Sequence, residues 1–176
     1  GLMVVENARG ESKGTQIQGK IYAVVTPLEG LSVTASYFTD FWQREAWDGR
    51  IYTDQWNFQL DQVGIDRTTG SRQSLTNTYR RNQRQVFDLY GDYAKSFGNH
   101  NFQLLVGYNQ EYYNTTNFRG GISDLLSYDT PVLDAGANDP QASGNSSDFA
   151  LRSVFGRLSY NFNGKYLLES NIRYDG

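Results

Sequence analysis

The chain has 176 residues, with 16 basic and 19 acidic side chains and a net charge of −3. That balance excludes the clustered excess of Lys and Arg on which nucleic-acid binding depends. The sequence has no cysteine, which excludes disulfides and thiolate metal sites. It has a single histidine, His100, which argues against a His-based zinc site or triad. No catalytic constellation is present, so we expect neither an enzyme nor a bound cofactor or metal.

Hydropathy separates two classes of membrane protein here. No apolar run approaches the roughly 20 residues of a membrane helix, which excludes helical membrane proteins only. A transmembrane β-barrel alternates apolar and polar residues, so its mean hydropathy resembles that of a soluble protein. Aromatic residues make up 15% of the chain, with 18 Gly and only 3 Pro, a mixture that favours strands over helices.

The first predicted elements are two strands joined by a tight turn. Residues 17–25 and 31–42 both alternate with a period near two. Between them, Pro27 fixes φ and Gly30 tolerates a positive φ, which predicts a chain reversal near residue 28. The two strands therefore form a hairpin.

Two more hairpins follow in the chain. Alternation over 83–97 and 102–112 surrounds a short turn near residue 98, and alternation over 154–162 and 166–175 surrounds a turn near residue 163. The last turn contains Asn163-Gly164, the strongest short-range hairpin signal.

The connections between the hairpins are long and polar, at about 43–82 and 113–148. Compact soluble domains have connections of about 4 to 6 residues, whereas outer-membrane barrels have tight periplasmic turns and long external loops. The spacing thus predicts an all-β, antiparallel meander of about six transmembrane β-strands. Single-chain barrels begin at about eight strands, so we expect part of a larger barrel. A soluble β-domain with a Tyr and Phe core is the alternative.

Each face of such a wall has its own environment, because the apolar face of a barrel meets lipid and the polar face lines the lumen. Phe102 and Tyr112 lie ten residues apart on one face and could mark two aromatic girdles, since a roughly 25 Å band takes about ten tilted residues. The predicted lumen-facing residues are Asp88, Asp92, Glu169, Arg173 and Asp175.

A family resemblance is carried by residues 155–169, which read FGRLSYNFNGKYLLE, and by 171–176, which read NIRYDG. These segments strongly resemble the barrel of SusC-like TonB-dependent transporters of the Bacteroidota. The segments GYNQE at 107–111 and GKIYA at 19–23 look like the same family in the same order. The resemblance covers most of the chain and is weak in the long loops.

The resemblance implies an outer-membrane barrel of about 22 strands, closed by an N-terminal plug, that imports large nutrients with energy relayed by TonB. It also implies a SusD-like surface lipoprotein as a lid and substrates that are chiefly oligosaccharides, with peptides in some members. The sequence begins without Met or a signal segment and shows no plug or TonB box. We therefore expect residues 1–176 to be a mid-barrel segment that reaches TonB through a missing N-terminal part.

Aromatic side chains are the candidates for contact with a ligand or with the lid, because flat rings stack on sugars and anchor protein interfaces. They are Trp42, Trp47, Tyr52, Trp56, Phe58, Tyr113 and Tyr128. An external girdle with a self-packed loop is the plainer interpretation of the same residues.

Two other functions stay open at this point. A soluble carbohydrate-binding β-sandwich would use the tryptophan-rich loop and would fold alone in water. A barrel segment would expose an apolar face and two strand edges, and would aggregate without detergent. A passive outer-membrane porin would differ from an importer in lacking the plug and the TonB box.

Overall fold

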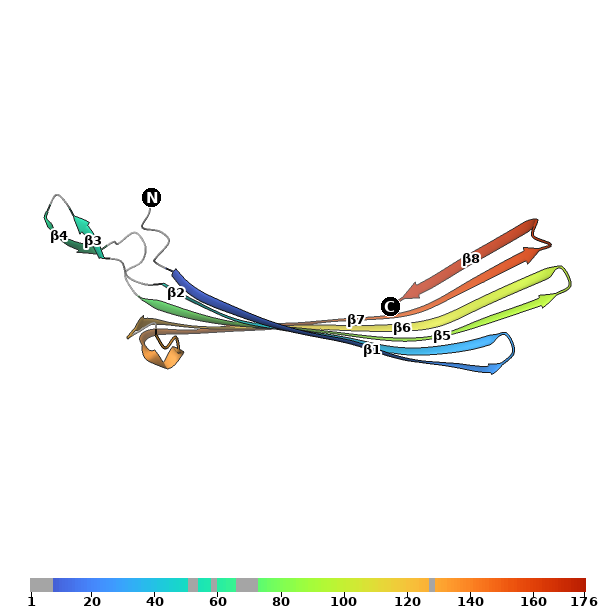
Figure 1. The fold of residues 1–176 in the computed structure, drawn as a ribbon, viewed down its shortest axis with the longest axis horizontal. Coiled ribbons are helices and arrows are strands. Elements are labelled where there is room, and N and C mark those ends of the chain that lie inside the picture. Colours follow the sequence, from blue (N-terminus) through green and yellow to red (C-terminus); the bar gives the residue numbers. More distant parts are fainter. Residues whose placement is uncertain (1–7, 51–53, 58–59, 66–72, 127–128) are drawn as a thin grey trace. The chain divides into compact units, whose positions relative to one another are not determined.

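The computed structural model describes residues 8–50, 54–57, 60–65, 73–126 and 129–176. Six strands form one sheet in the order β1-β2-β5-β6-β7-β8 (Figure 1). They are β1 (Ala8–Leu28), β2 (Leu31–Arg50), β5 (Ser74–Phe97), β6 (His100–Leu125), β7 (Gly136–Phe162) and β8 (Tyr166–Asp175). The predicted fold class, an all-β antiparallel meander of six strands, is confirmed.

A small strand pair and a short helix lie in the connections. β3 (Asp54–Asn57) and β4 (Gln62–Ile65) form a separate antiparallel pair between β2 and β5. The short 3₁₀ helix η1 (Leu133–Ala135) lies between β6 and β7. In the part of the chain that the structure describes, no helix is long and apolar enough to cross a membrane.

The tight turns lie near residues 29, 98 and 164, and each contains residues with a positive φ. Gly30 has φ 82° and Gly98 has φ 57°, while Asn163 and Gly164 have φ 51° and 68°. Glycine and asparagine reach this region at little steric cost, so these turns place consecutive strands side by side in antiparallel order. Gly30 also lies directly against Ala94 of β5, whose amide donates to the Gly30 carbonyl at 2.8 Å.

The strands run further than the alternation predicts. β2 continues to Arg50 and β5 begins at Ser74, so the connection expected at about 43–82 is shorter and contains the β3–β4 pair. β6 continues to Leu125 and β7 begins at Gly136, which shortens the connection expected at about 113–148 to residues 126–135. Residues 8–16, which precede the first predicted strand, are also part of β1.

Polar pairing explains this difference. Backbone hydrogen bonds build the sheet whatever the side chains are, so a strand need not alternate apolar and polar residues. In the extended parts, Asn117 donates to Asn145 at 2.9 Å, and the hydroxyls of Thr116 and Ser146 lie 3.4 Å apart. Such rows of polar residues have the composition of a loop, which is why the sequence pattern ends too early.

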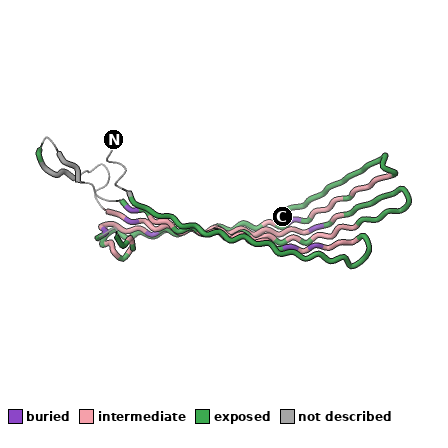
Figure 2. Tube along the Cα trace, in the orientation of Figure 1, coloured by how far each residue is buried: buried purple, intermediate pink, exposed green. Residues whose placement is uncertain are grey.

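The chain divides into two compact units, and five of the strands pass through both. Unit 1 comprises Gly1–Thr15, Trp42–Arg81 and Thr116–Ser146, and unit 2 comprises Gln16–Phe41, Asn82–Thr115 and Ser147–Gly176. The buried hydrophobic side chains of the described residues are Leu75 and Leu125, both in unit 1. Unit 2 therefore has no apolar core among its described residues. Most of the described trace is intermediate or exposed (Figure 2).

Candidate functional site

One face of the sheet in unit 2 is apolar and exposed. The register of β7 with β8 places Val154 opposite Tyr174, Gly156 opposite Ile172, and Leu158 opposite Ser170. Val154 is 53% exposed and Ile172 is 75% exposed. Further exposed hydrophobic side chains on strands of unit 2 include Ile17, Ile21, Tyr37, Phe87, Leu89, Leu104 and Val106. An apolar surface of this extent is typical of a contact with lipid or with another protein, because water disfavours it.

Aromatic rings gather beside the turns that end β5 and β7. The Nδ1 atom of His100 lies 2.7 Å from the Tyr160 hydroxyl. The Phe102 ring lies 4.8 Å from the Tyr160 ring, and the His100 ring lies 4.8 Å from the Phe162 ring, both measured between centroids. Tyr166 follows at 6.3 Å from Phe162. Rings with a polar edge beside short turns are typical of the membrane interface of a barrel.

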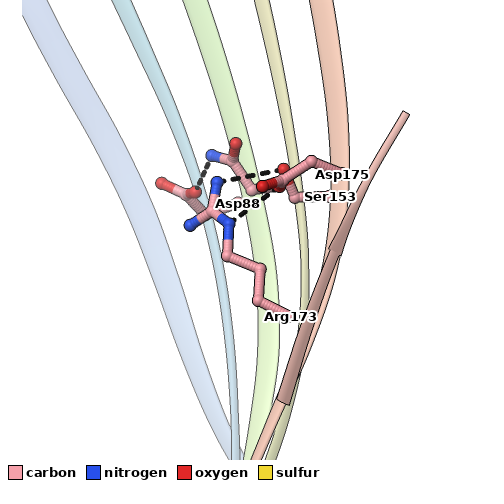
Figure 3. A network of polar contacts seen from close by, with 5 residues as sticks. Asp88, Ser153, Arg173 and Asp175 are labelled. Atoms are coloured by element: carbon pink, nitrogen blue, oxygen red, sulfur yellow. Dashed lines mark hydrogen bonds and ion pairs between the residues drawn. The ribbon is translucent and has the colours of Figure 1, made fainter. Parts of the chain in front are cut away.

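The opposite face of unit 2 is polar, and Asp88 lies at the centre of one network (Figure 3). Ser36 of β2 donates its hydroxyl hydrogen to Asp88 Oδ2 at 3.2 Å, and Asn109 of β6 donates to Asp88 Oδ1 at 2.6 Å. Ser36 is only 6% exposed. One carboxylate of β5 thus connects three neighbouring strands on the polar face.

A second network connects β7 with β8 on the same face (Figure 3). Arg173 Nε donates to Asp175 Oδ1 at 2.8 Å, and Arg173 Nη2 donates to the Ser153 hydroxyl at 3.1 Å. Ser153 is 1% exposed and lies opposite Asp175 in the register. The guanidinium is therefore held by two groups, and its position is fixed relative to both strands.

The other predicted lumen-facing residues also lie on this polar face. Gln103 donates to Asp92 at 3.1 Å, and Glu169 accepts from Asn171 at 2.9 Å and lies opposite Ser159. The structure thus brings Asp88, Asp92, Glu169, Arg173 and Asp175 to one face of unit 2. This face is rich in carboxylates, whereas the opposite face is apolar.

Sequence reasoning missed one aromatic residue on the polar face. The ring of Phe155 lies over Gly107, where a Cβ atom would overlap it. Glycine in a strand often marks a place where another group approaches closely. The glycine at position 107 is therefore a sequence signal for a contact such as the one with Phe155.

The described members of the predicted aromatic contact set lie on three different strands. Trp42 and Trp47 lie on β2, and Tyr113 lies on β6. Trp56 belongs to β3, where its backbone pairs with Val63. Tyr52, Phe58 and Tyr128 lie outside the described residues.

A small cavity of about 390 Å³ in unit 1 includes Trp47. Tyr79, Phe118 and Asn77 also line this cavity, and sequence reasoning did not select them. They come from β5 and β6, far from Trp47 in the chain, and only the pairing of strands brings them together. Among the described residues, no group of three or more His, Asp or Glu side chains could hold a metal ion.

Comparison with known proteins agrees with this architecture. No family model matches the chain. TonB-dependent receptor P3 of Formosa agariphila is 36% identical over 102 residues, which are 56% of this chain and 10% of that protein. TonB-dependent receptor SusC of Bacteroides thetaiotaomicron is 30% identical over 90 residues, which are 51% of this chain and 9% of that protein. The chain thus spans about a tenth of the curated relatives that it matches.

Solved structures show the same fold. The RagAB peptide transporter superposes with a TM-score of 0.82 and 17% identity, over 96% of this chain and 18% of that one. The RagAB peptide importer in its 'closed-closed' state gives a TM-score of 0.81 with the same identity and coverage. The resemblance to SusC-like TonB-dependent transporters that the sequence indicates is therefore confirmed.

Proposed function

We propose that this chain forms part of the barrel wall of a TonB-dependent importer in the outer membrane. The observation that carries the proposal is the contrast between the two faces of unit 2. One face exposes Val154, Leu158 and Ile172, and the other holds the networks around Asp88 and Arg173. Alternation of this kind suits a strand with lipid on one side and a polar lumen on the other.

The two rival functions fit the structure less well. A soluble β-sandwich needs a second layer that buries the apolar face, yet the described residues of unit 2 contain no buried hydrophobic side chain. A passive porin would share the wall, but the sequence similarity is to TonB-dependent receptors. These observations favour an importer.

The proposal extends to the partners of the whole protein. Energy would come from TonB, and a SusD-like lipoprotein would cover the end of the barrel to which unit 1 belongs. The substrate class we propose is an oligosaccharide, with a peptide as the alternative, since RagAB is named a peptide importer.

The test uses two serines that are matched in size but lie on opposite faces. Ser170 pairs with Leu158 on the apolar face, and Ser159 pairs with Glu169 on the polar face. Ser170→Cys and Ser159→Cys are made singly in the full-length protein, freed of any other cysteine, and spin-labelled in liposomes. We expect the label at 170 to be relaxed by oxygen and shielded from a water-soluble nickel complex, while the label at 159 shows less oxygen contact. Equal accessibility to the nickel complex at both sites would contradict a lipid-facing wall.

Import is tested separately in the host bacterium. Uptake of a radiolabelled oligosaccharide that supports growth should require both the gene and an intact TonB system. Uptake that persists without TonB would favour the porin.

A further inference from the structure

Two rows of side chains cross the apolar face of unit 2 beside the turn that joins β5 to β6. Phe97 and His100 flank that two-residue turn, so they face each other in the row nearest to it. The His100 ring continues this row to the Phe162 ring of β7, at 4.8 Å between centroids. In the next row, the Phe102 ring lies 4.8 Å from the Tyr160 ring. These five rings form an aromatic belt of the kind that lies between lipid tails and headgroups.

Lys95 and His100 place nitrogen atoms in the aromatic belt, and both side chains are exposed. The Nζ atom of Lys95 lies 5.0 Å from the centroid of the Phe97 ring, a cation–π contact that holds the ammonium on this face. Lys95 forms no ion pair with any residue that the structure describes. The Tyr160 hydroxyl lies 2.7 Å from Nδ1 of His100, whose Nε2 atom has no hydrogen-bond partner in the described part of the chain. Both side chains are therefore available to a ligand.

The carboxylates near this end of unit 2 do not neutralise Lys95. Glu29 and Glu169 line the same hollow as Lys95, but neither forms an ion pair with it. Glu169 belongs to the polar face, where it accepts a hydrogen bond from Asn171. Glu29 lies in the β1–β2 turn, and Lys165 in the β7–β8 turn adds a second ammonium group. Positive charge therefore exceeds negative charge on the side of the aromatic belt.

A membrane makes the unpaired ammonium of Lys95 costly. Leu104 and Leu158 lie two residues beyond the second row, on the side away from the turn, and both are exposed. In the proposed wall they contact lipid tails, where a charge without a counter-charge is unfavourable. A lysine at such a boundary extends its ammonium towards the headgroups. The counter-charge available there is phosphate.

We propose that Lys95 and His100 bind the phosphate of an acidic phospholipid headgroup, with the acyl chains lying on the aromatic belt. A phosphate oxygen accepts hydrogen bonds from an ammonium and from an imidazole N–H, and its charge compensates that of Lys95. A phosphatidylethanolamine headgroup brings an ammonium of its own, which the surplus positive charge disfavours. Tight turns of outer-membrane barrels lie on the periplasmic side, so the lipid belongs to that leaflet. The inference rests on the proposed function, because it names a lipid partner for the wall.

The experiment compares two exposed lysines. Lys95 lies in the aromatic belt, whereas Lys20 of β1 directly precedes Ile21, so alternation places it on the side away from that exposed apolar residue. Lys95→Gln and Lys20→Gln each remove one positive charge, so general attraction to an acidic lipid falls equally. Native mass spectrometry of the full-length protein in a nonionic detergent measures the affinity for the first molecule of phosphatidylglycerol or phosphatidylethanolamine. A second series adds inorganic phosphate as a competitor.

We expect the wild type to bind phosphatidylglycerol more tightly than phosphatidylethanolamine. Lys95→Gln should weaken phosphatidylglycerol binding about fivefold and His100→Gln about threefold, while Lys20→Gln and Lys95→Arg should leave it unchanged. Glu29→Gln should not weaken it, because that carboxylate repels the headgroup phosphate. Heat-modifiable migration in SDS gels checks that each variant is folded.

Three results would overturn the inference: equal binding of the two phospholipids, equal affinities of Lys95→Gln and Lys20→Gln, or displacement of the lipid by inorganic phosphate, which would indicate a site for a free anion. None of them bears on the lipid-facing wall, which the spin labels at 159 and 170 test by another readout. Conversely, TonB-independent uptake would reject the importer and keep the lipid site, since the wall of a porin meets the same lipid.

Discussion

The ring of Phe155 occupies the space in which a side chain at Gly107 would lie. The two residues belong to neighbouring strands, β7 and β6, on the polar face of unit 2. This contact explains why residue 107 of β6 is a glycine, since any larger residue would overlap the Phe155 ring. An aromatic ring that covers a strand glycine compensates for the packing that the glycine lacks.

Gly107→Ala should therefore destabilise the protein, because the new methyl group forces the Phe155 ring to move. The expected cost is about 1–2 kcal/mol. It is measured as a lower urea midpoint of the full-length barrel in heat-modifiability gels. Gly19→Ala is the matched control, since nothing lies within 4 Å of a Cβ atom there. Adding Phe155→Leu to Gly107→Ala should recover part of the loss, and a double variant no better than the single one would refute the contact.

Removal of the Asp88 carboxylate should weaken the connection among three strands. In Asp88→Ala, the buried Ser36 hydroxyl and the Asn109 amide lose their acceptor, which costs about 1–3 kcal/mol. Asp92→Ala removes a carboxylate with one exposed partner, Gln103, and should cost less. Urea midpoints of the two variants give the comparison. Equal decreases in the urea midpoint would show that the Asp88 network stabilises the sheet no more than the exposed contact of Asp92 does.

The pair formed by Tyr112 and Asp148 should make stability depend on pH. The Tyr112 hydroxyl donates to Asp148 Oδ1 at 2.6 Å, and Asn114 donates to the same oxygen at 2.7 Å. In the proposed barrel, Tyr112 lies at the edge of the apolar band, ten residues from Phe102 on the same face of β6. The hydrogen bond from Tyr112, followed by that from Asn114, holds the pKa of Asp148 below its usual range, and the bond to Asp148 raises the pKa of Tyr112.

A depressed carboxyl pKa gives stability that is present above the unfolded value of about 3.9 and is lost as pH falls through the folded value. Asp148→Asn should therefore lower the unfolding temperature at pH 7 and have a much smaller effect near pH 2. Because the pKa of Tyr112 is raised, its contribution to stability is present at neutral pH and is lost at alkaline pH, as the pH rises through a value above about 10. Asp134 is an exposed residue of η1, and Asp134→Asn should have no effect at either pH. A loss for Asp148→Asn that is the same at pH 7 and pH 2 would exclude this linkage.

Two turn glycines differ in their surroundings and allow a matched test. Gly30 and Gly98 both have a positive φ, but only Gly30 lies against another strand, at the carbonyl of Ala94. Asparagine tolerates positive φ, so Gly98→Asn should be nearly neutral. Gly30→Asn should cost about 1–3 kcal/mol because its Cβ atom meets the Ala94 carbonyl. Equal thermal stability of the two variants would show that β5 can move aside.

The sequence allowed the strand pairs and their two faces to be predicted, for physical reasons that particular residues illustrate. The turn at Asn163-Gly164 needs positive φ, and few other residue pairs supply it. Alternation over 166–175 separates Leu168 and Ile172 from Glu169 and Arg173, and the register of β8 keeps that separation. Both signals are local, so one sequence is enough to detect them.

The ends of the strands and the cavity could not be predicted in this way. The pairing of Asn117 with Asn145 depends on strands that meet only after the chain has folded, and both residues also suit a loop. The cavity joins Trp47, Tyr79 and Phe118 through the register of three strands. A single sequence contains no signal for register between distant segments.

The absence of a buried apolar core among the described residues of unit 2 changes what a mutation there can do. Shortening Leu104 or Leu158 creates no void, because lipid or solvent fills the space that the side chain leaves. Shortening Ser153, which is almost fully buried on the polar side, instead leaves the guanidinium of Arg173 without one of its acceptors. In most proteins, substitutions of apolar residues are the most harmful. In unit 2 we expect the reverse: substitutions of its exposed apolar residues are tolerated, whereas substitutions of its buried polar residues are not.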